Sequence, residues 1–281
     1  MSTPHLDRPW LVAVWPGMGN VGITAGFYLM AKLGMELLTE FSAHELFDVE
    51  AIRVKGGLIQ PGQLPRSRVF VGHPEGCERD ILVFIGESQP PSGKYAFCHR
   101  IVDYAASLGV ERVFTFAAMA TEMETEHESR VFGAATDATL LSELREHGVR
   151  VLEDGQIGGL NGVLIGAAAD RGLPGACLLG EMPHVLVQLP FPRASLAVLQ
   201  AFSRLTGIEV DYRELREQTR EMERRLVELL SRFERTDEER DWGEESSIAT
   251  EGPRSSPEDE SRIESLFAAA REDRSKAYEL K

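Results

Sequence analysis

Short, almost wholly apolar runs alternate with helix-like segments through the first 210 residues of this chain. A run such as Ile81–Ile85 (ILVFI) is apolar on both faces, which is typical of a strand buried inside a parallel sheet. The alternation and the short links predict an α/β fold, a layered sheet with helices on both faces. The predicted strands are Trp10–Trp15, Val69–Gly72, Ile81–Ile85, Val113–Ala117 and Ala176–Leu179. The predicted helices are Val21–Leu33, Tyr95–Leu108, Asp137–His147, Gly158–Ala169 and Ala194–Leu205.

The composition changes near residue 210. Beyond that point charged residues become dense, and the only glycines are Gly243 and Gly252. We therefore expect an α/β domain over residues 9–210, followed by a C-terminal helical tail. The tail divides into a heptad-patterned helix over residues 211–234, a polar linker over 235–256 that we expect to be disordered, and residues 257–281. The last segment has a helix-start pattern and a short apolar face, so it predicts either an amphipathic helix that folds onto a partner or a disordered tail.

The heptad-patterned helix carries an a/d stripe over about three heptads, in alternating steps of three and four residues. Its positions are Tyr212, Leu215, Thr219, Met222, Leu226, Leu229 and Phe233. A stripe of this kind needs an apolar surface to cover it. One interpretation is that the helix docks along its own domain. The other is a coiled-coil contact with another subunit, in which the contact residues would be Leu215, Met222, Leu226, Leu229 and Phe233.

The strongest local motif is Pro16-Gly17-Met18-Gly19-Asn20-Val21-Gly22, which follows a predicted strand and opens a predicted helix. Glycines permit tight turns and close backbone approach, and a helix start offers free N–H groups to an anion. The motif fits the spacing GxGxxG, but no acidic residue ends a second strand at the usual distance. A structural or protein-contact turn is thus one interpretation. A ligand site is the other, and its candidate residues are Gly17, Gly19, Asn20, Gly22 and Glu87, the last because it follows a buried strand.

Two further segments could suggest binding sites. Residues 154–166 (DGQIGGLNGVLIG) run from glycines into a helix of small residues, which predicts close helix packing or an anion-binding helix start. Residues 121–128 (TEMETEHE) hold four glutamates and one histidine. Their alternating spacing is wrong for one helix face, so we expect a solvated acidic loop and no metal site.

Charge and motif content exclude several classes of protein. A net charge of −15 disfavours binding to nucleic acid or to anionic membranes. Cys77, Cys98 and Cys177 form no CxxC pair, and GxSxG, GxxxxGK[ST] and HExxH motifs are absent. No basic-then-apolar leader opens the chain, and no apolar run reaches ~18 residues. We expect a cytoplasmic protein with no membrane contact, no catalytic residues and no cofactor.

Four segments in this order resemble the PAC2 family, the proteasome assembly chaperone 2-like proteins. They are the PGMGNVG turn, Glu87–Pro90 with the helix after it, the GGLNG run, and Leu178–Met182 (LLGEM), with Pro190-Phe191-Pro192 and a helical tail beyond; the resemblance covers about residues 9–230. It implies a phosphorylase- or hydrolase-like α/β domain, self-assembly, and binding to proteasome subunits or another protein. Chaperones of this family that dock on proteasomes end in a hydrophobic-Tyr-any tripeptide. This chain has Tyr278 fourth from its end, which departs from that pattern.

Two functions are consistent with the residues and the resemblance. The first is a non-catalytic, homo-oligomeric protein-interaction or proteasome-assembly-chaperone-like role. The alternative is a nucleotide- or phosphate-binding protein, or an enzyme of phosphorylase-like or ATP-grasp-related type, that uses the Gly17–Gly22 turn.

Overall fold

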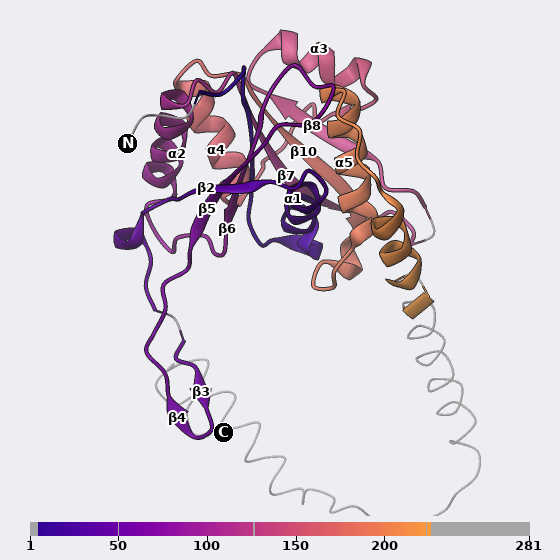
Figure 1. Cartoon of the computed structure of the whole chain (residues 1–281). Coiled ribbons are helices and arrows are strands. Elements are labelled where there is room, and N and C mark those ends of the chain that lie inside the picture. Colours follow the sequence, from indigo (N-terminus) through magenta and orange to yellow (C-terminus); the bar gives the residue numbers. More distant parts are fainter. Residues whose placement is uncertain (1–4, 50, 126, 223, 226–281) are drawn as a thin grey trace, which may run out of the picture. The chain divides into compact units, whose positions relative to one another are not determined.

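The computed structural model describes residues 5–49, 51–125, 127–222 and 224–225, which belong to one compact unit that spans residues 1–226. Its main sheet has eight strands in the order β2-β5-β6-β1-β7-β10-β8-β9 (Figure 1). The strands are β1 (Trp10–Val14), β2 (Glu36–Glu40), β5 (Ser67–Gly72), β6 (Ile81–Gly86), β7 (Arg112–Thr121), β8 (Val131–Ala135), β9 (Arg150–Val151) and β10 (Gly175–Pro183). A separate two-stranded hairpin contains β3 (Val54–Lys55) and β4 (Leu58–Ile59).

The centre of the sheet is parallel, as the apolar runs predict. Strands β6, β1, β7 and β10 lie side by side in that order, and every residue of β6 is buried. The flanks differ from the simple parallel expectation, because β5 is antiparallel to β6 and β8 is antiparallel to β10. In β5 and β8 buried residues are interspersed with half-buried ones, so these strands lack the burial along their whole length that marks a central strand.

Helices cover both faces of this sheet, which confirms the predicted α/β class. They are α1 (Val21–Lys32), α2 (Lys94–Ser107), α3 (Ala138–Glu146), α4 (Gly159–Asp170) and α5 (Pro192–Thr206). Alternate residues of β1 point to opposite faces. Trp10, Val12 and Val14 join the core under α1, α3 and α5, whereas Leu11, Ala13 and Trp15 join the core under α2 and α4. Figure 1 shows α2 beside α4 at one side of the sheet and α1 and α5 at the other.

Local signals set the helix ends where the sequence predicts them. Asp137 caps α3, because its carboxylate accepts a hydrogen bond from the Leu140 N–H at 2.9 Å. Gly148, which follows α3, has φ +80° and so takes the left-handed conformation that glycine tolerates. No helix within the described part of the chain is long and apolar enough to cross a bilayer.

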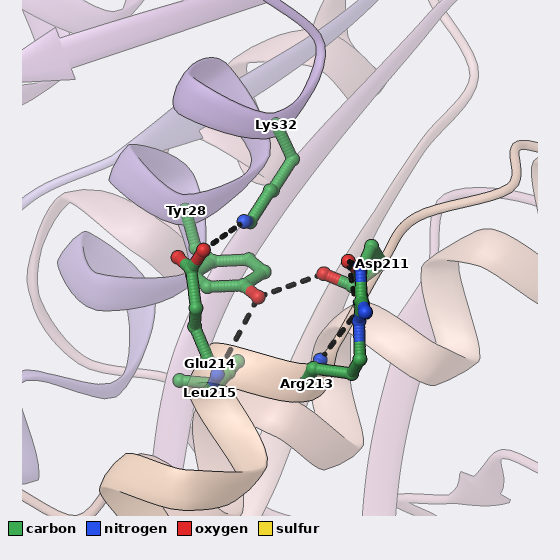
Figure 2. Close-up of polar contacts among 6 residues, drawn as sticks. All are labelled: Tyr28, Lys32, Asp211, Arg213, Glu214 and Leu215. Carbon is green, nitrogen blue, oxygen red and sulfur yellow. Dashed lines mark hydrogen bonds and ion pairs between the residues drawn. The ribbon is translucent and has the colours of Figure 1, made fainter.

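A further helix begins at Arg213 and includes the first positions of the heptad stripe. Figure 2 shows how its first turn is fastened to α1. The Tyr28 hydroxyl donates to the Asp211 carbonyl oxygen at 2.7 Å, and Lys32 Nζ lies 2.8 Å from a Glu214 carboxylate oxygen. The Asp211 carboxylate accepts from the Arg213 N–H at 3.0 Å, and hydrogen bonds from Arg213 lower the pKa of Asp211 to about 2. The start of this helix is therefore attached to its own domain.

This attachment corrects one expected contact residue. Leu215 is fully buried in the core beneath α1 and α5, so it packs inside its own chain and is not free for another subunit. Met222 is half-buried and lines a small apolar depression with Leu189 and Pro190. Leu226, Leu229 and Phe233 lie outside the described residues, as do the predicted linker over 235–256 and the segment 257–281. The intersubunit role of the rest of the stripe and the division of the tail stay predictions.

Candidate functional site

Two glycine-rich segments that are far apart in the sequence, residues 16–22 and 154–166, meet at the carboxyl edge of the parallel strands. There they enclose a cavity of about 510 Å³, which we call the glycine-turn cleft. Gly17 and Met18 form one wall, residues 155–159 form another, and the carboxyl half of β7 forms the floor. Ligand sites in open α/β sheets lie at this edge, and this volume is in the usual range for small-molecule pockets.

The glycines of the first turn, residues 17–22, have different structural roles. Gly19 has φ +59°, and Asn20 has φ +51°, so the chain turns through two left-handed residues just before α1. A Cβ on Gly22 would lie 2.1 Å from the Phe116 carbonyl oxygen, so α1 can approach β7 this closely only without a side chain there. Gly17 is extended, and a Cβ there would meet nothing within 4 Å, because it faces open space at the cleft.

The second glycine segment brings the start of α4 to the same cleft. A Cβ on Gly162 would lie 1.9 Å from the Ile157 carbonyl oxygen, so this turn closes tightly onto the first turn of the helix. The Gln89 side chain joins the two segments. Its Oε1 accepts from the Leu160 N–H at 3.2 Å, and its Nε2 donates to the Pro16 carbonyl oxygen at 3.5 Å. Gln89 thereby links the two segments that form the walls of the cleft.

The cleft is lined mainly by apolar groups, and its polar side chains, Gln89, Gln156 and Asn161, are uncharged. Among the described residues that line it, none is Lys, Arg, His, Asp or Glu. Asn161 lines the cleft and is 9% exposed, and its amide oxygen has no hydrogen-bond partner within the described structure. The helices α1 and α4 both begin here, and a helix start carries partial positive charge and unpaired N–H groups. Apolar side chains of Trp15, Phe116 and Ile157 supply the rest of the wall.

The structure brings together only part of the ligand set expected from the sequence. Gly17 and Gly22 line the cleft. Gly19 does not, because its N–H donates to the Val187 carbonyl oxygen and its carbonyl accepts from the Phe191 N–H. Asn20 is exposed outside the cleft. Glu87 turns toward β5, where it pairs with the Arg68 guanidinium at 2.6 Å and accepts from the Arg66 N–H.

Two residues that border the cleft, Gln89 and Asn161, were not singled out from the sequence. Both occur in segments that carry the family resemblance, the ESQP and GGLNG runs. Their roles depend on which turns meet in space, and sequence spacing alone does not show that.

A buried acidic group lies at the carboxyl end of β10, next to the acidic segment 121–128. The Glu181 side chain is 1% exposed and forms a salt bridge with Arg130, with Arg130 Nε 2.5 Å from its carboxylate. The Thr121 hydroxyl donates to the same carboxylate at 2.8 Å. Hydrogen bonds from Arg130, and secondarily from Thr121, hold the pKa of Glu181 below its ordinary value of 4.5 despite its burial.

We expect Glu181→Gln to lower the free energy of unfolding at pH 7 by about 1–2 kcal/mol, since charged hydrogen bonds contribute about 1.5–3 kcal/mol and half-exposed Arg130 is partly screened. The pKa of Glu181 is depressed in the folded state. Its stabilisation is therefore present above about pH 4.5 and is lost as the pH falls through the lower folded-state pKa. Urea unfolding at pH 7 and at acid pH measures this. The difference in the free energy of unfolding between wild type and variant should become smaller at acid pH. Glu124→Gln, at an exposed site, serves as the control, and an equal loss in both variants would contradict this assignment.

Among the described residues that line the cleft, none is Ser, Thr, Cys or Lys, and the two buried cysteines lie elsewhere in the core. Burial raises the pKa of the Cys98 and Cys177 thiols to about 12, so both stay protonated at neutral pH. In the acidic segment His127 lies 3.7 Å from Glu124, and Glu122 lies 3.3 Å from His184 of the 3₁₀ turn η3 (His184–Leu186); all four side chains are exposed. Within the described ranges, no three His, Cys, Asp or Glu side chains converge as a metal site.

Comparison with known proteins places the chain among relatives of the same architecture. It is 29% identical over 232 residues to the uncharacterized protein MJ1210 of Methanocaldococcus jannaschii, covering 82% of this chain and 85% of that one. The crystal structure of Pyrococcus furiosus PbaB, an archaeal proteasome activator, matches with a TM-score of 0.68 and 25% identity, over 80% of this chain and 95% of PbaB. The Mycobacterium tuberculosis proteasome-assembly chaperone homologue Rv2125 shares the fold, with a TM-score of 0.68 and 24% identity over 78% of this chain and 94% of Rv2125. The profile of the PAC2 family matches residues 11–230, and the chain therefore belongs to the PAC2 family.

Proposed function

We propose that this chain is a non-catalytic PAC2 family protein that acts as a homo-oligomer through contacts with other protein chains, in the manner of a proteasome assembly chaperone. Family membership over residues 11–230 carries the proposal. The likeness to PbaB, described as a proteasome activator, supports proteasome subunits as the first partner to test. A cytoplasmic location goes with this proposal and stays a prediction.

The chemistry of the described residues supports a role without catalysis. The glycine-turn cleft has no charged lining residue among them, and the two fully buried thiols are held protonated. General acid–base or nucleophilic catalysis needs a titrating group within hydrogen-bond reach of the reacting atom. The cleft walls offer backbone and amide groups instead, which suit binding.

The test is an assembly reaction with proteasome α subunits from the source organism. Purified α subunits are mixed with and without the full chain, and ring formation is followed by native mass measurement over time. We expect the chain to associate with α subunits or their rings and to change the rate at which rings appear. No association and no change in rate would count against a proteasome partner.

A second candidate, small-molecule binding, is favoured by the glycine-turn cleft itself. A cavity of about 510 Å³ at the carboxyl edge of parallel strands, flanked by two helix starts and bordered by the unpartnered amide oxygen of Asn161, suits a ligand with a small polar head and an apolar body. The lack of a basic lining residue within the described part disfavours a polyphosphate. The Asn161 amide oxygen accepts hydrogen bonds, so a neutral molecule that carries a hydrogen-bond donor fits these walls better than the nucleotide expected from the motif.

A thermal-shift screen decides this second candidate. The panel contains monocarboxylates, nucleosides, nucleotides and inorganic phosphate, because a ligand at 100 times its Kd stabilises the fold by about 2.7 kcal/mol. Gly158→Leu is the matched variant. Gly158 lines the cleft, its φ is −79° and an added Cβ meets nothing within 4 Å, so the backbone accepts a leucine without strain, and we expect its side chain to reduce the space in the cleft. A ligand that raises the melting temperature of the wild type but not that of Gly158→Leu supports binding in the cleft. A flat response across the panel, or a shift that survives in Gly158→Leu, argues against it.

A further inference from the structure

Asn161 is a buried residue of the glycine-turn cleft whose amide oxygen has no hydrogen-bond partner among the described residues. It belongs to the first turn of α4 and is only 9% exposed. Asparagine is a weaker helix former than leucine, and a buried polar group without a partner destabilises a fold. Neither the helix nor the packing therefore accounts for an amide at this position, whereas a hydrogen-bonding ligand in the cleft would.

The backbone around Asn161 is held in place by its neighbours. The Thr115 hydroxyl of β7 donates a buried hydrogen bond to the Asn161 backbone carbonyl oxygen at 3.0 Å. The preceding N–H, that of Leu160, donates to Gln89 Oε1 at 3.2 Å. Asn161 therefore presents its side-chain amide from a fixed point of the cleft wall. A half-turn of this amide about the Cβ–Cγ bond exchanges its carbonyl and its N–H end, so either end is able to meet a ligand.

The charges around Asn161 favour a neutral ligand. Among the described residues that line the cleft there is no cationic side chain to pair with a carboxylate and no acidic one to pair with an amidinium. A carboxylate would also bring acceptor oxygens to the side-chain carbonyl of Asn161, which needs a donor. An amidinium would bring positive charge to the positive end of α4. Burying either charge without a partner is costly.

A carboxamide satisfies the Asn161 side chain without a charge. Its N–H donates to the side-chain carbonyl of Asn161 while its own carbonyl accepts from the side-chain N–H, which makes two parallel hydrogen bonds in one plane. The apolar side chains of Trp15, Phe116 and Ile157 line the same cleft, and they suit an apolar body attached to the amide.

We propose that the glycine-turn cleft binds a neutral carboxamide with an apolar body, and that Asn161 is the residue that determines this specificity. Primary amides and lactams form this class, because both present an N–H and a carbonyl side by side. This specificity rests on the small-molecule binding proposed above as the second candidate function, to which it adds the chemical class of the ligand.

Three aromatic compounds of nearly equal shape test the specificity. At neutral pH benzamide is a neutral carboxamide, benzoate is an anion without a donor, and benzamidinium is a cation without an acceptor. Each is added to the full chain up to millimolar concentration, and its Kd is obtained from the rise in melting temperature. We expect benzamide to bind, and the other two to bind at least about tenfold more weakly, because each leaves one end of the Asn161 amide unpaired. The effect of benzamide should disappear in Gly158→Leu.

Asn161→Asp keeps the shape of the side chain and replaces its N–H end with a second acceptor. It should bind benzamide at least about tenfold more weakly than the wild type and benzamidinium more tightly, an exchange that a purely structural role of Asn161 would not produce. Asn20→Asp is the matched control. Asn20 is exposed outside the cleft, and aspartate tolerates its φ of +51°. This variant should bind benzamide as the wild type does.

Asn161→Leu provides a second variant that introduces no buried charge. Leucine has a similar volume, and the amide oxygen that it removes has no described partner, so the melting temperature without ligand should not fall. Benzamide should no longer raise the melting temperature of this variant.

Contrary results separate the specificity from the binding function. Equal Kd values for the three compounds would overturn the amide specificity and leave small-molecule binding standing, as would an unchanged Kd for benzamide in Asn161→Asp or Asn161→Leu, or an equal loss in Asn20→Asp. A wild type that binds a nucleoside in the cleft but not benzamide would have the same meaning. A benzamide effect that survives in Gly158→Leu, or no response of the wild type to any compound, would overturn the specificity and the binding function together.

Discussion

Gly22→Ala should destabilise the domain by about 2–3 kcal/mol, the cost of overpacking a well-filled core. A Cβ at this position lies 2.1 Å from the Phe116 carbonyl oxygen and 2.9 Å from its carbonyl carbon. These are backbone atoms of β7, so no rotamer change can relieve the clash, and α1 must move away from the sheet. The midpoint of urea unfolding should fall accordingly.

The matched control for this prediction is Gly17→Ala in the same turn. Gly17 has φ −168°, which any residue adopts, and an added Cβ meets nothing within 4 Å. Its effect on the free energy of unfolding should stay within about 0.5 kcal/mol. Equal stability of the two variants would show that α1 does not approach β7 as closely as described.

Leu215→Asp should lower the free energy of unfolding by at least about 3 kcal/mol. The change removes a fully buried leucine side chain and leaves an unpaired carboxylate beneath α1 and α5. Because the packing is within one chain, the loss should not depend on protein concentration. Thermal melts at several concentrations measure both quantities.

Gln218→Asp, an exposed position on the same helix, is the control for this charge and should change stability little. A Leu215→Asp variant that keeps its melting temperature but loses oligomer mass would contradict burial of Leu215 in its own domain. That outcome would instead assign Leu215 to a contact between subunits.

The central strands and all five labelled helices could be predicted from the sequence, because continuous apolar runs and amphipathic periodicity are local signals. The ILVFI run marks β6 by itself, and Asp137 marks the start of α3. Edge strands carry no such signal. The β2 sequence ELLTE is exposed or half-buried along its length, and the hairpin at Gly56-Gly57 is exposed throughout, so neither has the alternation of a half-buried strand.

The candidate site could be predicted only in part. The PGMGNVG and GGLNG segments each indicated a tight turn before a helix, but their meeting in one cleft depends on strand order, which local patterns do not encode. Glu87 shows the same limit. Its place after a buried strand predicts a ligand role. In the structure Glu87 forms an ion pair with Arg68 of the neighbouring antiparallel strand β5, and its carboxylate therefore points away from the cleft.

The heptad stripe likewise predicts that a helix face is buried but does not identify the surface that buries it. A 3,4 spacing predicts that one side of a helix will be covered, and burial of Leu215 and Thr219 agrees with that for the first two turns. The spacing does not say which surface covers it. In this chain the cover comes from α1 and α5, and Tyr28 fixes the register by bonding to the backbone of Asp211.

The central claim is that this PAC2 family protein works by presenting its surface to other protein chains, and the mass of the full chain in solution tests it most directly. Light scattering at micromolar concentration, alone and with proteasome α subunits, should give a multiple of 31.1 kDa that rises further when the subunits are added. A mass of 31.1 kDa under both conditions would contradict it.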